Sequence, residues 1–209
     1  MTECIMTRIQ PLTEPIVTSD TFQKLHREVL ACTLCREQLP YEPRPILQIH
    51  PDACILVAGQ APGVRAHEAG KPFADASGKR LRDWMGVDEA TFYDSRRIAI
   101  VPMGFCYPGK GKSGDRPPCT DCAPTWRQRI LDAMPNIEVT LVIGQYAMDW
   151  HLAGRFGSLT EAVRDGMDSA RGIYPMPHPS PRNIAWFKRN PWFEQERLSV
   201  IRKAIARAL

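Results

Sequence analysis

Two short loops, about a hundred residues apart, carry the residue types best suited to holding a small ligand. The first is Gly59–Gly63, which follows the apolar run Cys54–Ala58, and the second is His178–Asn183, which follows residues 172–177. Each pattern predicts a strand that ends in a rigid turn, which is where open α/β sheets bind ligands. A single histidine is most often structural, but one fixed on such a loop favours hydrogen bonding to a small planar ligand.

The chain has seven cysteines, and five of them fall into two groups with metal-ligand spacing. Cys32 and Cys35 form one Cys-x-x-Cys pair, and Cys106 precedes a second pair, Cys119 and Cys122. Two such pairs can supply the four thiolates that hold zinc or an iron–sulfur cluster. The spacing does not choose between these metals, and unligated cysteines are the alternative. A disulfide framework is not expected in a cytoplasmic chain of this size.

Short apolar segments alternate with amphipathic segments, and this order predicts the elements that position the loops. Strands are expected at 54–58, 97–101, 139–143 and just before His178, and helices at 77–86, 126–134, 146–152 and 192–209. A further helix, with Ser19 and Asp20 as candidate caps, is expected to carry Phe22, Leu25, Val29 and Leu30. Residues 36–53 hold four prolines and are expected to form an ordered loop. The alternation predicts an α/β fold, a three-layer α/β/α sandwich with a central, mostly parallel four-stranded sheet.

The composition is that of a globular protein with one core. The chain has 209 residues, of which 44% are hydrophobic and 24% charged, and a net charge of +4. No apolar run reaches the length of a membrane span, and the N-terminus lacks the layout of a signal peptide. We therefore expect one domain over residues 1–209, with residues 1–18 disordered or loosely attached, in the cytoplasm. The charge is compatible with an anionic partner.

Several motifs occur in one order that is typical of a known enzyme family. They are Gly59-Gln60-Ala61-Pro62-Gly63, Gly70-Lys71-Pro72-Phe73, Ser77-Gly78, Cys106 with Cys122, and His178-Pro179-Ser180-Pro181. Together they resemble the uracil-DNA glycosylase superfamily, nearest to the branches called family four and family five. The resemblance covers roughly residues 28–183. It implies a monomeric, monofunctional DNA repair enzyme that flips uracil or another deaminated base out of DNA and hydrolyses its N-glycosidic bond.

The same resemblance implies a cofactor. The two branches carry a four-iron cluster on a Cys-x-x-Cys pair and two later cysteines some sixteen positions apart. Cys32, Cys35, Cys106 and Cys122 reproduce this layout, because the last two are sixteen positions apart. The expected ligands of a 4Fe-4S cluster are therefore these four residues, with Cys119 as a spare, and zinc or no metal is the alternative.

Site roles also follow from the resemblance. It implies that His178 donates a hydrogen bond to uracil O2 and that Phe73 stacks on the flipped base, although Phe73 also fits a core aromatic. The catalytic residues expected are Asp75, His178 and Gln60; the base-binding residues are Gly59, Ala61, Pro62, Gly63, Phe73 and Gly104; the DNA-binding residues are Ser180, Pro181, Arg182 and Asn183. The basic segment 107–118 is either a loop that touches the DNA backbone or an ordinary surface loop.

Two departures from the family bear on activity. Family four has a glutamate where this chain has Gln60, so Asp75 is the expected catalytic carboxylate, and the cap of the helix at 77–86 is its alternative role. Several branches read uracil with an asparagine where this chain has Pro102. Either backbone groups near Gly104 read the base, or the pocket tolerates other deaminated bases. A catalytically weak or inactive DNA-binding protein is the alternative function.

Overall fold

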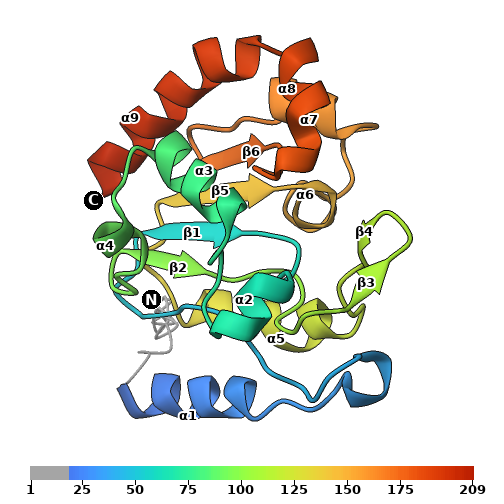
Figure 1. Cartoon of the computed structure of the whole chain (residues 1–209). Coiled ribbons are helices and arrows are strands. Elements are labelled where there is room, and N and C mark those ends of the chain that lie inside the picture. The colour runs from blue at the N-terminus through green and yellow to red at the C-terminus, as the bar shows by residue number, and fades with distance from the viewer. Residues whose placement is uncertain (1–18) are drawn as a thin grey trace, which may run out of the picture.

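Four parallel strands form the central sheet (Figure 1). They are β1 (Ile55–Ala58), β2 (Ile98–Ile100), β5 (Val139–Ile143) and β6 (Ile173–Met176), arranged in the order β2-β1-β5-β6. The computed structural model describes residues 19–209, so the expectation for residues 1–18 lies outside the described residues. The predicted sheet is confirmed, and each of its strand pairs is parallel.

Helices and a small hairpin surround this sheet. The α-helices are α1 (Ser19–Leu30), α2 (Val64–Ala69), α3 (Ala76–Met85), α4 (Glu89–Phe92), α5 (Cys122–Asp132), α6 (Gln145–His151), α7 (Leu159–Asp165), α8 (Ile184–Arg189) and α9 (Leu198–Ala208). The shorter elements are the 3-10 turns η1 (Arg36–Gln38) and η2 (Pro181–Asn183), the π-helical turn η3 (Phe193–Arg197), and the hairpin of β3 (Lys110–Gly111) and β4 (Gly114–Asp115).

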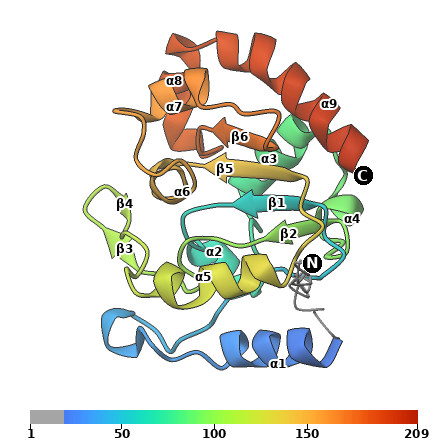
Figure 2. The ribbon, with the colours of Figure 1, turned by 180° about the vertical axis from the view of Figure 1, so that it is seen from behind.

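The two faces of the sheet bury separate sets of side chains, as alternation along a strand requires. Ile55 and Val57 pack in one core with residues of α3 and α9. Leu56, between them, packs in a second core with residues of α1 and α5. Figure 2 shows α5 on the face of the sheet opposite to α3. Because both faces are covered, the strands are continuous apolar runs, and this confirms the three-layer prediction.

Several elements differ from the sequence-based prediction. The helix expected at 126–134 begins earlier, at Cys122, because Pro124 lies in its first turn, where no intrahelical N–H is needed. The helix expected at 192–209 is divided into η3 and α9. The helices α2, α4, α7 and α8 were not predicted. They have four to seven residues, too few to show a clear helical period in the sequence.

The sheet brings the two candidate loops to one edge. The segment after β1 starts at Gly59, the segment after β2 holds Pro102, and the segment after β6 holds His178. All of them leave the carboxyl ends of parallel strands, so they lie on the same side. The chain moves to β2 on one side of β1 and later to β5 on the other, which creates the switch point where such sheets bind ligands.

Candidate active site

A cavity of about 410 Å³ lies at this edge of the sheet. Its volume is within the range of small-molecule sites. The expected site residues that line it are Gly59, Gln60, Ala61, Pro62, Gly63, Phe73, Asp75, His178, Ser180, Pro181 and Arg182. Two expected residues, Gly104 and Asn183, are not among the residues that line it. The topology therefore assembles most of the predicted site from three separate stretches of the chain.

His178 is held as a neutral hydrogen-bond donor. Its Nδ1 accepts a hydrogen bond from the backbone N–H of Ser180 at 3.1 Å, so the ring proton is assigned to Nε2. Burial lowers the pKa of His178 below 6.5, and the nearby charge of Asp75 opposes this shift. The imidazole is therefore neutral at pH 7 and keeps one N–H to offer to a ligand in the cavity.

The loop around His178 is fixed by two side chains whose roles were not predicted. Asn183 donates from Nδ2 to the backbone oxygen of His178 at 2.8 Å, so the structure places this expected DNA-binding residue within the loop. Arg80, on α3, donates from Nη1 to the oxygens of Pro179 and Ser180 at 3.2 and 3.4 Å. Arg182 is exposed beside the mouth of the cavity. The contact of Arg80 spans about a hundred positions of sequence and therefore leaves no local pattern.

Phe73 forms a wall of the cavity in an unusual backbone conformation. Its φ is +53°, in the left-handed region, which costs a non-glycine residue about 1–3 kcal/mol. The Tyr93 hydroxyl lies within 3.3 Å of the Phe73 backbone oxygen and within 3.0 Å of that of Pro72. The rings of Phe73 and His178 lie 29° from parallel, with centroids 6.5 Å apart. Phe73 also packs on the edge of Phe92, so it serves both the core and the cavity.

Gly78 is the residue that leaves room for this conformation. A Cβ added at Gly78 would lie 1.8 Å from the backbone oxygen of Phe73. We expect Gly78→Ala to lower the free energy of unfolding by about 1–3 kcal/mol, because the rigid backbone of Phe73 must move. Chemical denaturation measures this difference. Gly157→Ala is the matched control, since its added Cβ meets only the flexible Glu161 carboxylate, at 3.4 Å. Equal stability of the two variants would contradict the packing argument.

Asp75 caps a helix and also lines the cavity, so its position is compatible with both roles considered in the sequence analysis. Its Oδ1 accepts a hydrogen bond from the backbone N–H of Gly78 at 3.0 Å, as the N-cap of α3. The same residue lines the cavity and is close enough to His178 to influence its pKa. The cap holds the carboxylate in place, so the two roles are compatible.

The side chain of Gln60 and the backbone of Gly104 lie on opposite sides of the first loop. Gln60 donates from Nε2 to the backbone oxygen of Arg116 at 3.4 Å, which leaves its amide oxygen free to accept. Gly104 donates its N–H to the backbone oxygen of Gln60 at 3.0 Å, and it lies beside the cysteines, away from the cavity. The structure thus assigns Gly104 to the support of the loop.

The β3–β4 hairpin places a second carboxylate at the cavity. Asp115 lines the cavity, and its Oδ2 lies 3.4 Å from where a Cβ on Gly63 would be. The neighbouring Gly114 approaches Arg182 so closely that a Cβ there would lie 2.8 Å from the guanidinium. The sequence indicated only a basic loop here, because a hairpin of two-residue strands has no readable period.

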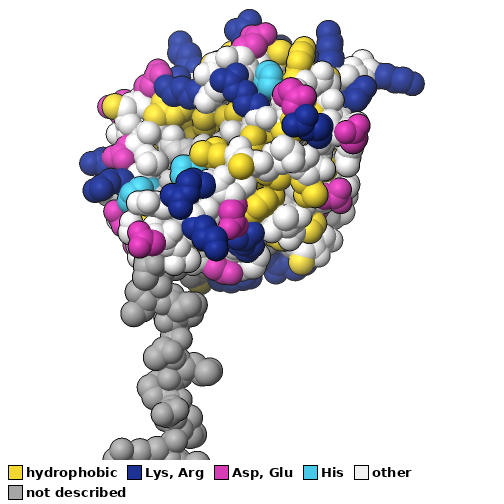
Figure 3. All heavy atoms as spheres, turned by 90° about the horizontal axis from the view of Figure 1, so that it is seen from below, with side chains coloured by type: hydrophobic (Ala, Val, Ile, Leu, Met, Phe, Trp, Pro, Cys, Tyr) yellow, Lys and Arg dark blue, Asp and Glu magenta, His cyan; other side chains and the backbone are white. Residues whose placement is uncertain are grey.

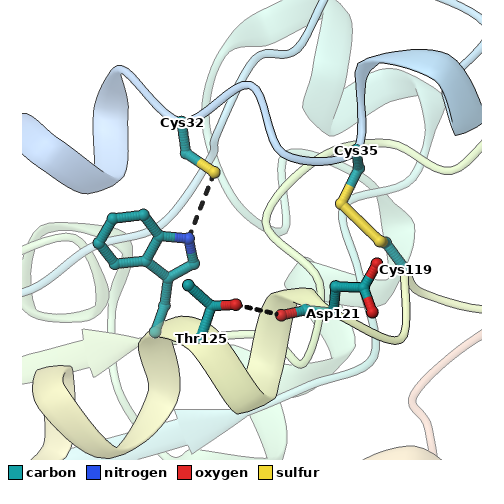
Figure 4. Close-up of a disulfide and its surroundings, with 6 residues drawn as sticks. Cys32, Cys35, Cys119, Asp121 and Thr125 are labelled. Carbon is teal, nitrogen blue, oxygen red and sulfur yellow. Dashed lines mark hydrogen bonds between the residues drawn. A yellow bond between two sulfur atoms is a disulfide. The ribbon is translucent and has the colours of Figure 1, made fainter.

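Five cysteines surround a separate, smaller cavity of about 20 Å³. Cys35 and Cys119 form a disulfide (Figure 4), which differs from the expectation of a free ligand and a spare thiol. They are 84 positions apart in sequence, but the fold brings their Cα atoms to 6.6 Å. With this bond in place, residues 19–209 contain no group of three or more His, Cys, Asp or Glu side chains placed to hold a metal.

The three other cysteines at this cavity are free. Cys32 Sγ accepts a hydrogen bond from the Trp126 indole N–H at 3.2 Å. Burial raises the pKa of the Cys122 thiol to about 12 and also raises the pKa of Cys106. Cys32, Cys106 and Cys122 lie close together, because all three line this one small cavity.

Comparison with known proteins matches the chain to a family and to a curated relative. A sequence model described as the uracil DNA glycosylase superfamily matches residues 47–202. A curated relative from Sulfurisphaera tokodaii, named Type-4 uracil-DNA glycosylase, is 28% identical over 128 residues. This alignment covers 58% of the present chain and 54% of the relative, so the chain spans about half the length of that protein.

Proposed function

The chain belongs to the uracil DNA glycosylase superfamily, because the family match spans most of its length, and we propose that it removes uracil or another deaminated base from DNA. The observation that carries this proposal is the cavity bounded by the nearly parallel rings of Phe73 and His178. A flipped base is planar and needs such a pocket, because its glycosidic bond cannot be reached inside the duplex. The named activity of the relative supports the same reaction.

In the proposed reaction the bond between C1′ and the base nitrogen breaks, and its electron pair leaves with the base. Negative charge then develops on the base, where the Nε2–H of neutral His178 donates a hydrogen bond. A neutral imidazole suits this task, because its Nε2–H can donate a hydrogen bond to the leaving base without transferring its proton. Phe73 supplies the stacking surface. The backbone amides of Gln60 and Ala61 are proposed to bind the base oxygens.

Water completes the reaction by bonding to C1′, and the proton that it releases to solvent balances the proton that the base anion takes up to become the neutral base. The Asp75 carboxylate stabilises the positive charge on the sugar and orients this water. The free amide oxygen of Gln60 can hold the same water but cannot take its proton. Among the described residues that line the cavity there is no lysine, so water, and not an amine, is the proposed nucleophile. A monofunctional enzyme follows from this choice.

DNA is proposed to contact the loop Ser180–Arg182 and the exposed Lys110 and Lys112 of the neighbouring hairpin. Lys and Arg side chains on the face seen in Figure 3 are mixed with Asp and Glu, so that face is not uniformly basic. The proposed contact is limited to the loop and the hairpin beside the cavity. In residues 19–209 no helix combines the length and apolar character needed to cross a membrane. The cytoplasmic location and the monomeric state stay predictions from the sequence.

The test is base release under single-turnover conditions from oligonucleotides that carry uracil, hypoxanthine or xanthine, single-stranded and paired. Alkaline cleavage then reports the abasic site. Release of at least one base supports the proposal. Binding of these oligonucleotides without release, with protein in excess and its metal loaded, would instead support a DNA-binding protein on the same fold. The family match and the named relative favour the enzyme.

We also propose that Cys32, Cys35, Cys106 and Cys122 hold an iron–sulfur cluster once the Cys35–Cys119 disulfide is reduced. These four residues fit such a group, because their side chains line one cavity and thiolates are the ligands that iron–sulfur clusters require. When bound, the group would tie the loop after α1 to the segment after β2 and to α5. It is given no part in the bond-breaking step.

The cluster predicts a specific pattern of iron retention. Cys32→Ser, Cys106→Ser and Cys122→Ser are each expected to lose bound iron, because each removes a thiolate ligand, whereas Cys119→Ser is expected to keep it. Elemental analysis and visible absorbance of protein purified without oxygen measure this. Cys54→Ser is the control, since Cys54 donates to the backbone oxygen of Arg97 away from the group. Zinc in place of iron, or iron in all variants, would contradict the proposal.

A further inference from the structure

The segment that follows β2 has its backbone donors occupied. Val101 donates to the backbone oxygen of Val57, and Met103 donates to that of Gly59, both at 2.9 Å. Gly104 donates to Gln60, as described above, and Pro102 has no N–H. The sequence led us to expect that backbone groups near Gly104 could read the base. The N–H groups of this segment are already used to hold the first loop.

The backbone oxygens of Val101 and Pro102 in this segment are occupied from inside the protein. Arg127, on α5, is fully buried, and its Nη1 donates to the oxygens of Val101 and Pro102 at 3.0 and 3.3 Å. Its other nitrogens contact His151 Nε2 at 2.6 and 3.2 Å. Burial lowers the pKa of His151 to about 3 and that of Arg127 to about 10, so at pH 7 a charged donor faces a neutral acceptor. Arg127 therefore keeps both carbonyls engaged.

As a result, one wall of the cavity offers apolar surface. Pro102 is buried and lines the cavity together with Ile46 and Ile100. The polar side chains described above, Asp75 and His178 among them, come from other segments of the lining. A base that enters the cavity thus contacts an apolar wall at Pro102 and polar groups, such as Asp75 and His178, on other parts of the lining.

We propose that this wall makes the enzyme accept uracil and hypoxanthine with similar efficiency. The inference rests on the proposed base release. A wall that hydrogen-bonds its substrate rejects other bases, because a wrong base leaves buried polar groups unpaired. At Pro102 no such group is left unpaired, whichever base edge faces it. Both bases carry a carbonyl beside a ring N–H for the polar side, and the volume of about 410 Å³ is in the range that holds purine-sized ligands.

The test compares release of uracil and of hypoxanthine from single-stranded oligonucleotides of otherwise identical sequence. For the unaltered protein we expect the two single-turnover rates to differ by no more than about tenfold, since apolar walls discriminate weakly. Pro102→Asn places a side-chain amide on the wall, and Pro102→Val is its matched control. Both variants add the same backbone N–H, so only the amide differs between them.

We expect the uracil-to-hypoxanthine ratio of Pro102→Asn to exceed that of Pro102→Val by about tenfold or more, because one base can pair with the amide and the other leaves it unpaired. Equal ratios in the two variants would overturn the inference. So would an unaltered protein that releases uracil more than about a thousandfold faster than hypoxanthine. In both cases the proposed function stands. Release of neither base by the unaltered protein also overturns the inference, and the proposed function falls with it only if xanthine and the paired substrates are not processed either.

Discussion

His178→Ala is expected to slow base release by about 10²–10³-fold, the usual loss when one donor to a developing negative charge is removed. The donor is the Nε2–H, since Nδ1 already accepts from Ser180. Release under single-turnover conditions measures the bond-breaking step. His50→Ala is the control, because His50 lies outside the cavity and its Nδ1 likewise accepts a backbone hydrogen bond, from the N–H of Asp52 at 3.1 Å. A His178→Ala rate equal to that of the control would mean that another group stabilises the leaving base.

The same residue sets the acid limit of activity. Protonation of Nδ1 would break the hydrogen bond from Ser180 and disturb the loop. Burial lowers the pKa of His178, so the neutral form persists below pH 6.5, and release is expected to fall only as the pH drops through this lowered pKa. Asp75 opposes the shift, so its removal should move the acid limit to still lower pH. The rate of base release as a function of pH, measured for the unaltered protein and for Asp75→Asn, tests both effects.

The sheet was predictable because its signal is local. A strand covered on both faces is mainly apolar along its length, and the runs at 54–58 and 139–143 have this character. A glycine follows each run and marks where the strand ends. The position of the cavity was predictable from the parallel sheet itself, because parallel strands have their carboxyl ends at one edge. Short helices such as α2 give too few turns for a period to emerge.

The supports of the site were not predictable, because they depend on contacts between distant segments. Arg80 reads as a surface charge on a helix, yet it holds the loop of His178 from 99 and 100 positions away. Arg127 also sits in an amphipathic helix, and only the fold shows that its guanidinium is buried against the end of β2. The positive φ of Phe73 could not be predicted from the sequence either. Only the structure shows that the backbone of Phe73 requires a glycine at position 78. Pairing of Cys35 with Cys119 likewise has no signal in the spacing.

Asp75→Asn is the second change expected to have a large effect, and it separates the two roles of this residue. Asparagine caps a helix about as well as aspartate, so the hydrogen bond from Gly78 should remain and the unfolding free energy should stay close to that of the unaltered protein. The negative charge is lost, and base release is expected to slow by about 10²-fold, because the cationic sugar and the attacking water lose their carboxylate. Single-turnover release and chemical denaturation are measured on the same preparation.

Asp88 provides the matched control, because it caps α4 in the same way, accepting from the backbone N–H of Thr91 at 2.8 Å, and does not line the cavity. Asp75→Ala and Asp88→Ala should each lose about 1 kcal/mol of stability with the cap. Of these three variants, only the two at Asp75 should lose activity. If Asp75→Asn keeps its full rate while Asp75→Ala does not, the residue acts on catalysis solely through the cap. The carboxylate for the sugar must then be sought at Asp115, which lines the same cavity.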